Sequence, residues 1–356
     1  MKHGFLKTGL IWLSVLFLHG CAHRDFSAGR SPLPQEPVEK VLRNLPLSAE
    51  FEDKVLALNP DSITGRDITE VLSRCPAPRL IALNGSIPLI TMESFSKFLI
   101  LMGYPEERVR NPRTRSYTYT SYMSSKHLAG LIAWHYEKEG MMPLIVGHSQ
   151  GGMLSVKVLY ELSGAFRDKI AVWNPYREEP EDRYAIRDPL TDIERPVVGL
   201  RVGYASAIAT GRLMRFLLGQ WDMLTRLRKI PDTVEEFTGF HIQNDLIGGD
   251  FLGLGQSYYP LGTAVVHNVK LPAEYSHMTI PLTEDLAKEP ETREWINSYT
   301  PSTENPPLPD ALRGGRNNIL FAADIWHHIK KYWCIELQRL IRAQRDMKRI
   351  SSVYGG

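Results

Sequence analysis

The stretch Pro143-Leu144-Ile145-Val146-Gly147-His148-Ser149-Gln150-Gly151-Gly152-Met153-Leu154 decides the fold. Its short apolar run after the proline is typical of a buried strand, and the next apolar residues, Val156, Leu159 and Leu162, have helical spacing. Between them lies Gly-x-Ser-x-Gly, in glycine-rich sequence where any Cβ would collide at a tight reversal. The spacing therefore predicts a strand, a sharp turn and a helix, with the Ser149 hydroxyl above the sheet edge and the helix N-terminus beneath it.

The same rhythm of short apolar runs and amphipathic segments continues on both sides of this stretch. Further strands are predicted at residues 79–83, 169–173, 237–242 and 263–271, and further helices at 91–102, 124–139, 283–297 and about 319–349. Such alternation is typical of a parallel sheet covered by helices on both faces. The predicted fold class is therefore α/β.

With a strand before it and a helix after it, the Gly147-to-Gly151 turn resembles that of the α/β-hydrolase superfamily, in particular its lipases and esterases. The resemblance covers residues 79 to about 280. It implies the α/β-hydrolase fold, a mostly parallel central sheet flanked by helices, and it implies that Ser149 is a nucleophile. The alternative is that the turn is purely structural.

A serine hydroxyl becomes a useful nucleophile only when a base can take its proton and a carboxylate orients that base. In the family the chain order is serine, acid, histidine, with the last two after late strands. The resemblance therefore implies Asp245, after the strand ending at Ile242, as the acid, and His277, after the final strand, as the base. Asp250 is the alternative acid.

Other histidines fit this role less well. His267 lies inside a predicted strand, and His148 is constrained by the turn itself. Adjacent His327 and His328 point to different faces of a helix and, with Asp324, make a poor metal site. No metal and no cofactor is predicted.

The loop after the strand at 79–83 reads Asn84-Gly85-Ser86-Ile87. In the resembled family this loop supplies one backbone N–H of the oxyanion hole, and the residue after the nucleophile supplies the other. The resemblance therefore implies Ser86 and Gln150 as the donors, with Ile87 as the alternative to Ser86. Many lipases have His-Gly where this chain has Asn84-Gly85.

The regular rhythm stops between residues 175 and about 233, and an insertion at this place resembles the helical cap or lid of hydrolases. Apolar side chains in it would form a wall of the pocket above Ser149. The alternative is ordinary packing on the main domain. The apolar residues of the expected lid helix are Ile208, Leu213, Met214, Phe216, Leu217, Leu218 and Trp221.

The N-terminus carries Lys2 and Lys7 before a nine-residue apolar run, which is too short to span a bilayer and is typical of a signal peptide, residues 1–20. The sequence from Leu18 to Cys21 resembles a bacterial lipobox, which implies lipidation of Cys21. Residues 21–45 are then a lipid anchor and proline-rich tether, and residues 46–356 the hydrolase domain. An ordinary cleaved signal peptide is the alternative.

Two cysteines remain, Cys75 and Cys334. In an oxidising compartment such a pair can form a disulfide, but the sequence does not bring the two together. Two separate buried thiols are therefore the expectation.

Composition narrows the function further. The 356 residues are 43% apolar, enough for a sizeable core, and 42 basic against 40 acidic residues give a net charge of +2. No long basic patch accompanies this balance, so nucleic acid is not a predicted partner.

Together these features predict a membrane-anchored serine hydrolase that cleaves carboxylic, lipid-like or acyl esters through an acyl-enzyme. Its expected location is the bacterial cell envelope, on the periplasmic side of the outer membrane, and its expected partners are an ester or lipid-like small molecule and the membrane. The alternatives are an acyltransferase or thioesterase with the same three residues, or a non-catalytic lipoprotein that binds a ligand.

Overall fold

The computed structural model describes residues 47–87, 90–212, 215, 218–245, 247–248, 257–301 and 318–354. All of them belong to one structural unit, Pro34–Gly356. The expected signal peptide, Cys21, the whole of the tether, and Asp250 lie outside the described residues.

A five-stranded sheet forms the centre of this unit. Its spatial order is β1-β2-β7-β9-β11, and every neighbouring pair is parallel. The strands are β1 (Leu80–Leu83), β2 (Leu144–His148), β7 (Val202–Ile208), β9 (Val234–Ile242) and β11 (Val265–Leu271). Because all five run the same way, their carboxyl ends share one edge, which is where such sheets bind ligands.

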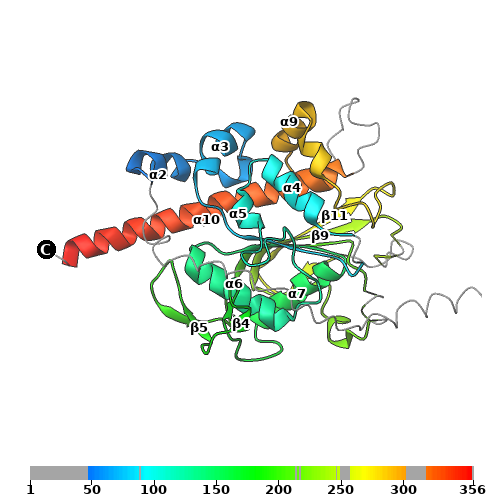
Figure 1. The fold of residues 1–356 in the computed structure, drawn as a ribbon, viewed down its shortest axis with the longest axis horizontal. Coiled ribbons are helices and arrows are strands. Elements are labelled where there is room, and N and C mark those ends of the chain that lie inside the picture. Colours follow the sequence, from blue (N-terminus) through cyan, green and yellow to red (C-terminus); the bar gives the residue numbers. More distant parts are fainter. Residues whose placement is uncertain are drawn as a thin grey trace, which may run out of the picture. The chain divides into compact units, whose positions relative to one another are not determined.

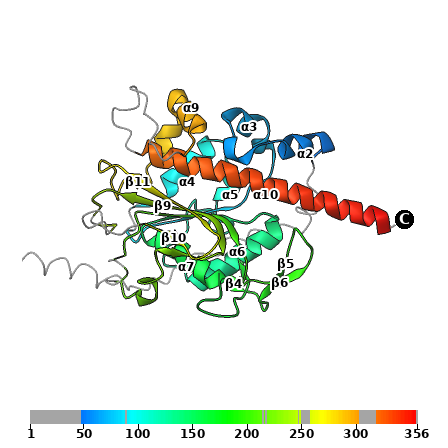
Figure 2. The same cartoon turned by 180° about the vertical axis from the view of Figure 1, so that it is seen from behind.

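Helices cover both faces of the sheet, as Figures 1 and 2 show. On one face α4 (Glu93–Leu101) and α10 (Ile319–Tyr354) cover β1 residues Leu80 and Ala82. On the other face α6 (Ser125–Glu139) and α7 (Gln150–Leu162) cover the alternate residues Ile81 and Leu83. β1, β2 and β7 are thus buried along their whole length, which is why such strands read as apolar runs instead of alternating patterns, whereas the edge strand β11 is largely exposed. The predicted α/β class is confirmed.

The remaining helices are short. They are α2 (Ala49–Leu56), α3 (Gly65–Glu70), α5 (Glu106–Val109) and α9 (Pro290–Ser298), with 3₁₀ turns at Pro60–Ser62, Leu72–Arg74, Trp221–Met223 and Glu284–Ala287. At the start of α3, Thr64 and Asp67 form a reciprocal capping box.

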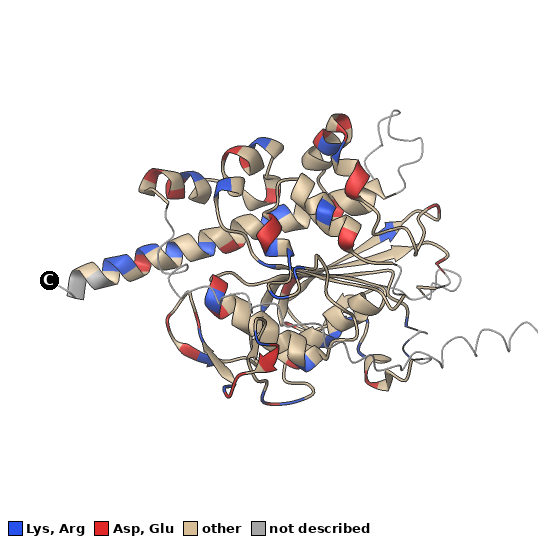
Figure 3. Ribbon diagram, viewed as in Figure 1, with Lys and Arg blue, Asp and Glu red and all other residues tan. Residues whose placement is uncertain are grey.

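The long helix α10 is tied to the N-terminal segment by polar contacts. Gln338 donates from Nε2 to the carbonyl oxygens of Val55 and Leu58, and Arg345 pairs with Glu52. Figure 3 shows its basic residues concentrated toward the C-terminal end. The sequence predicts that these charges serve solvation and the helix dipole, and the structure adds that some of them form ion pairs.

One predicted strand is wrong, and one strand of the central sheet is not predicted. Of the predicted strand 169–173 only Trp173 joins a strand, β3 (Trp173–Asn174), and it pairs antiparallel with β4 (Glu179–Pro180) outside the main sheet. Ile170 and Val172 are buried in the core beside α6 and α7, which explains why this segment is apolar although it is not a strand of the sheet. The next parallel strand is instead β7, inside the region expected to be a lid.

The expected insertion at 175–233 is therefore not one helical cap. β7 divides it, pairing with β2 on one side and β9 on the other, and all seven of its residues are buried. Ile208, expected on a lid helix, ends this strand. Before β7 lies an antiparallel pair, β5 (Ala185–Arg187) and β6 (Glu194–Pro196), and after it β8 (Lys229–Ile230) pairs with β10 (Tyr259–Pro260). Leu213, Met214, Phe216 and Leu217 lie outside the described residues.

Cys75 and Cys334 are both buried free thiols, which confirms the expectation of separate cysteines.

Candidate active site

Ser149 occupies the sharp corner between β2 and α7. Its backbone has φ 53° and ψ −111°, a conformation that costs a residue with a side chain about 1–3 kcal/mol and that gathers at functional sites. The corner is held because the Ser149 N–H donates to the Ile208 carbonyl at 2.7 Å. A Cβ on Gly147 would lie 2.3 Å from the Gly151 carbonyl oxygen, and one on Gly151 would lie 2.4 Å from that of Leu83. The sequence thus folds into the predicted turn because only glycine fits around it.

The structure brings Ser149, His277 and Asp245 together. The Ser149 Oγ lies 3.1 Å from His277 Nε2, and His277 Nδ1 lies 2.8 Å from Asp245 Oδ2. The three residues come from the ends of β2 and β9 and from the loop after β11. Both distances fall within hydrogen-bond reach, so proton transfer from the hydroxyl to the imidazole needs no rearrangement.

The Asp245 carboxylate is held ionised. It is 9% exposed, and burial alone would raise its pKa. The hydrogen bond to His277 and its charge, together with the backbone N–H groups of Gly248 and Ile247, outweigh burial and lower the pKa of Asp245. Gly248 donates to Oδ1 at 2.8 Å, which leaves Oδ2 to accept from the imidazole. Asp245 can therefore fix the His277 tautomer and stabilise an imidazolium.

His148, within the turn, contacts the backbone of His277. Its Nε2 lies 3.0 Å from the His277 backbone carbonyl oxygen, and the two ring centroids are 5.0 Å apart. Burial, with the charge of His277, lowers the pKa of His148 to about 3, so the ring is neutral. Since a carbonyl only accepts, the proton of the neutral ring is on Nε2.

The loop after β1 lies against Ser149. An ideal Cβ on Gly85 would be 3.4 Å from the Ser149 Cβ, so Ser86 follows directly beside the serine. Gln150 is the first residue of α7, where leading backbone N–H groups have no carbonyl partner within the helix. The loop is fixed by Tyr122, whose hydroxyl donates to the Ser86 carbonyl at 3.0 Å. The loop that carries Ser86 and the first residue of α7 thus both adjoin Ser149.

A cavity of about 530 Å³ lies beside the start of α7, with Gln150 in its lining. Gln150, Met153 and Lys157 line it from α7, Phe166 lines it from the loop after α7, and Tyr122 lines it from the loop before α6. Its size suits a small organic substrate.

A further layer of contacts supports the turn. Thr210 donates from Oγ1 to the Ser149 carbonyl at 3.0 Å, and Arg215 donates to the Gln150 side-chain oxygen. The sequence gives no signal for Thr210, because it follows β7, the strand that the sequence reading missed. The sequence also gives no signal for the contact of His148 with the His277 carbonyl, because the two residues are far apart in the chain.

The remaining histidines considered in the sequence lie away from the triad. His328 Nδ1 is 3.1 Å from Glu236 Oε1, and its Nε2 is 3.4 Å from Asp324 Oδ1. His267 donates from Nε2 to the same Glu236 oxygen at 2.8 Å. Within the described ranges no group of three His, Cys, Asp or Glu residues is arranged to hold a metal ion.

Comparisons with protein-family models, with curated proteins and with solved structures gave no match. Across the part of the chain that the structure describes, no helix combines the length and apolar character needed to cross a membrane.

Proposed function

We propose that the chain is a serine hydrolase of α/β-hydrolase type that cleaves carboxylic esters through an acyl-enzyme. The observation that carries the proposal is the continuous contact from the Ser149 hydroxyl through His277 to Asp245, with Ser149 on a strained backbone corner. Strain of this kind is maintained where it serves a site.

In the first half-reaction His277 Nε2 takes the Ser149 proton while Oγ attacks the ester carbonyl carbon. The negative charge that develops on the carbonyl oxygen is stabilised by the backbone N–H groups of Gln150 and Ser86. The C–O bond to the alcohol then breaks as His277 returns the proton to the leaving oxygen, and the acyl group stays on Ser149.

In the second half-reaction water takes the place of the alcohol. His277 accepts a proton from the water, the resulting hydroxide attacks the acyl carbon, and the proton returns to Ser149 Oγ as the acid leaves. The cavity lined by Met153 and Phe166 is where we place part of the ester. The proposal includes anchoring to the envelope membrane through a lipid on Cys21.

The test is covalent labelling with a fluorophosphonate probe combined with turnover of p-nitrophenyl butyrate. Ser149→Ala is expected to abolish labelling and to lower kcat/KM by at least about 10⁴-fold. Ser163→Ala is a matched control, because this serine lies at the exposed C-terminal end of α7 and bonds only locally to Tyr160.

A folded wild-type protein that takes up no probe would refute the proposal and indicate a binding protein on the same scaffold. An added alcohol that captures the acyl group in preference to water would reassign the enzyme as an acyltransferase.

A further inference from the structure

Arg215 binds two glutamine side chains that both line the cavity of about 530 Å³ beside α7. Its Nη1 donates to Oε1 of Gln150 and, at 2.5 Å, to Oε1 of Gln220. Arg215 is 2% exposed, so water competes little for these bonds. A guanidinium group has no acceptor, so the oxygen of each amide must face Arg215 and the NH2 group of each is turned away from it.

The two amide groups lie side by side, because a single nitrogen binds both oxygens. We call Gln150 and Gln220 the amide pair. Gln150 directly follows Ser149 and is the first residue of α7. The amide pair therefore supplies two NH2 donors at one place in the cavity lining, next to the turn that carries the nucleophile.

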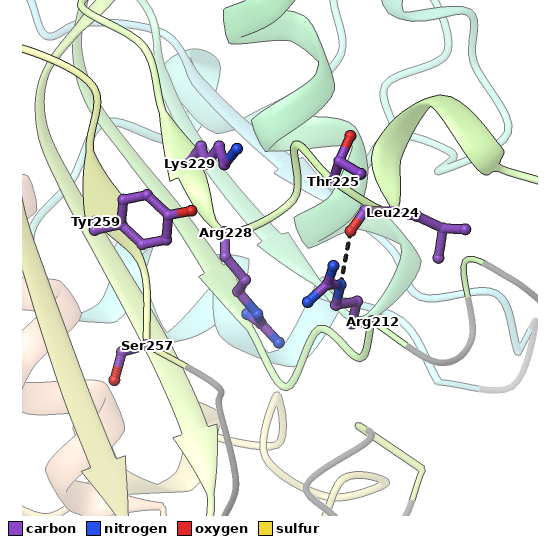
Figure 4. A pocket seen from close by; sticks show the side chains of 7 residues that line it. All are labelled: Arg212, Leu224, Thr225, Arg228, Lys229, Ser257 and Tyr259. Carbon is purple, nitrogen blue, oxygen red and sulfur yellow. Dashed lines mark hydrogen bonds between the residues drawn. The ribbon is translucent and has the colours of Figure 1, made fainter.

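The segment that carries Arg215 and Gln220 is held in place before any ligand binds. Arg212 donates from Nε to the Leu224 carbonyl at 2.7 Å, which ties the two ends of the segment together. Figure 4 shows this bond among the residues that line a neighbouring pocket. Within the segment the Gln220 N–H donates to the Arg215 carbonyl at 2.8 Å. Donors that are fixed in advance lose little freedom on binding, which favours recognition of a ligand.

Three hydroxyl groups that line the same cavity have their protons committed to the protein. The bonds run from Ser121 to the Gly85 carbonyl at 3.1 Å, from Tyr122 to the Ser86 carbonyl at 3.0 Å and from Ser125 to the Glu161 carboxylate at 2.7 Å. A hydroxyl has one proton, so these three oxygens can only accept a further hydrogen bond. Two of the bonds also join the cavity lining to the loop that lies against Ser149.

The charged side chains of the lining are paired with one another. Lys157 lies 2.7 Å from Asp222, and Arg167 lies 2.7 Å from Glu161. Among the described residues of the lining, cations and carboxylates therefore balance. A charged ligand would have to disrupt one of these pairs or enter without a counter-charge, and both are unfavourable.

We propose that this cavity binds an uncharged polyhydroxylated group, a sugar or a polyol, and that this group is the alcohol part of the ester cleaved at Ser149. A ligand hydroxyl can accept from the amide pair and donate to the committed serine and tyrosine oxygens, which neither an alkyl chain nor a carboxylate can do. Met153 and Phe166 add apolar surface for the C–H face of a ring. A sugar or polyol is esterified through one of its own hydroxyls, so it forms the alcohol part. The inference rests on the proposed function for the position of the ester.

Binding is tested first without any ester. Methyl glucoside is titrated into the full-length protein and observed by NMR. The reference ligand is cyclohexylmethanol, which has the same ring size but lacks the ring hydroxyls. The wild type is expected to bind the glucoside more tightly than the reference ligand, because only the glucoside can use the donors and acceptors of the lining.

Gln220→Leu tests the amide pair. The variant should bind the glucoside about three- to tenfold more weakly, as expected when one or two hydrogen bonds between uncharged groups are lost. Gln243→Leu, the same change at an exposed glutamine outside this lining, is the control and should bind as the wild type does. Thermal unfolding of each variant checks that it is folded.

The substrate assignment is tested with two butyrate esters of matched shape, glucose esterified on its primary hydroxyl and cyclohexylmethyl butyrate. The wild type is expected to have a kcat/KM at least about tenfold higher for the glucose ester. Gln220→Leu should lower the ratio of the two kcat/KM values about three- to tenfold. The butyrate ester of hydroxymethyl-cyclohexanecarboxylate is the third substrate, and a preference for it over the glucose ester would overturn the uncharged class.

Equal kcat/KM values for the glucose and cyclohexylmethyl esters in an active enzyme would overturn the substrate assignment. Undiminished glucoside binding by folded Gln220→Leu, or no binding by the wild type, would overturn the site itself. Glucoside binding that depends on Gln220 in a protein that cleaves no ester would instead refute the proposed function and leave the sugar site standing.

Discussion

His148 Nε2 donates to the backbone carbonyl oxygen of His277 over 3.0 Å, so a residue of the nucleophile turn fixes the main chain of the residue proposed as the base. The bond joins β2 to the loop after β11, which are 129 residues apart in the chain. The position of the imidazole therefore depends on a neighbour that takes no proton itself.

Replacing His148 by Phe is expected to lower kcat about 10- to 100-fold with little change in KM. Phenylalanine keeps a ring but cannot donate, and a misplacement of about 1 Å in a catalytic group costs this much. Steady-state kinetics on p-nitrophenyl butyrate measure the effect. His148→Gln, whose amide can still donate, should recover part of the rate, and a Phe variant with wild-type kcat would contradict the positioning role.

Asp245→Asn is expected to reduce kcat about 10⁴-fold while the protein stays folded. An amide nitrogen facing His277 Nδ1 favours the imidazole tautomer that cannot accept the serine proton. The Gly248 N–H can still be accepted by the side-chain oxygen, so the loop should keep its shape. Activity should be measured beside Asp250→Asn, and a larger loss in that variant would make Asp250 the acid.

His328 should make the protein less stable in alkaline solution. Burial lowers its pKa, but Asp324 and Glu236 outweigh burial and raise the pKa to about 9. The protonated ring is thus favoured by folding, so its contribution is complete below pH ~6.5 and is lost as the pH rises through about 9. The loss is on the order of 3 kcal/mol in the free energy of unfolding.

Urea denaturation at pH 6 and pH 9.5 measures this loss. His328→Gln is expected to remove most of the difference between the two pH values. His127→Gln is the comparison, because burial lowers the pKa of His127 to about 4 and the ring is neutral throughout. An equal alkaline loss in wild type and His328→Gln would show that another group is responsible.

The two cysteines of the folded domain should react slowly with a thiol reagent. Both are buried, and burial raises the pKa of Cys75 and of Cys334 to about 12, so neither holds a thiolate at neutral pH. Ellman's reagent should label neither in native protein at pH 8 and both in urea, with Cys75→Ala and Cys334→Ala identifying each. Two thiols that stay silent in urea until a reductant is added would indicate a disulfide.

The sequence predicts the sharp turn at Ser149 and four of the five strands of the central sheet. It also predicts that Ser149, Asp245 and His277 meet beside that turn. The turn can be predicted because a side chain at position 147 or 151 would collide with neighbouring backbone. The strands can be predicted because short apolar runs between polar loops indicate buried strands. The chain order of serine, acid and histidine in the resembled family then selects Asp245 and His277, because these residues follow the strands that end at Ile242 and Leu271.

β7 was missed for a physical reason. Most of its residues are small, namely Gly203, Ala205, Ser206 and Ala207, and such a run has less β-branched and aromatic bulk than a typical strand. A tertiary contact accounts for Gly203, since a Cβ there would lie 2.8 Å from the Tyr332 ring on α10. That packing cannot be read from the sequence, and neither can the contact of Thr210, which follows this strand, with Ser149.

The attachment of α10 to the helix at Ala49–Leu56 bears on the order in which the polypeptide can mature. Part of one face of the sheet stays uncovered until α10 (Ile319–Tyr354) has left the ribosome, because α10 shares with α4 the cover over Leu80 and Ala82. Synthesis from the N-terminus therefore produces a nascent chain in which apolar residues of this sheet face are exposed. The packing of this face is therefore completed only after α10 has been synthesised, and apolar surface that is exposed before then favours aggregation.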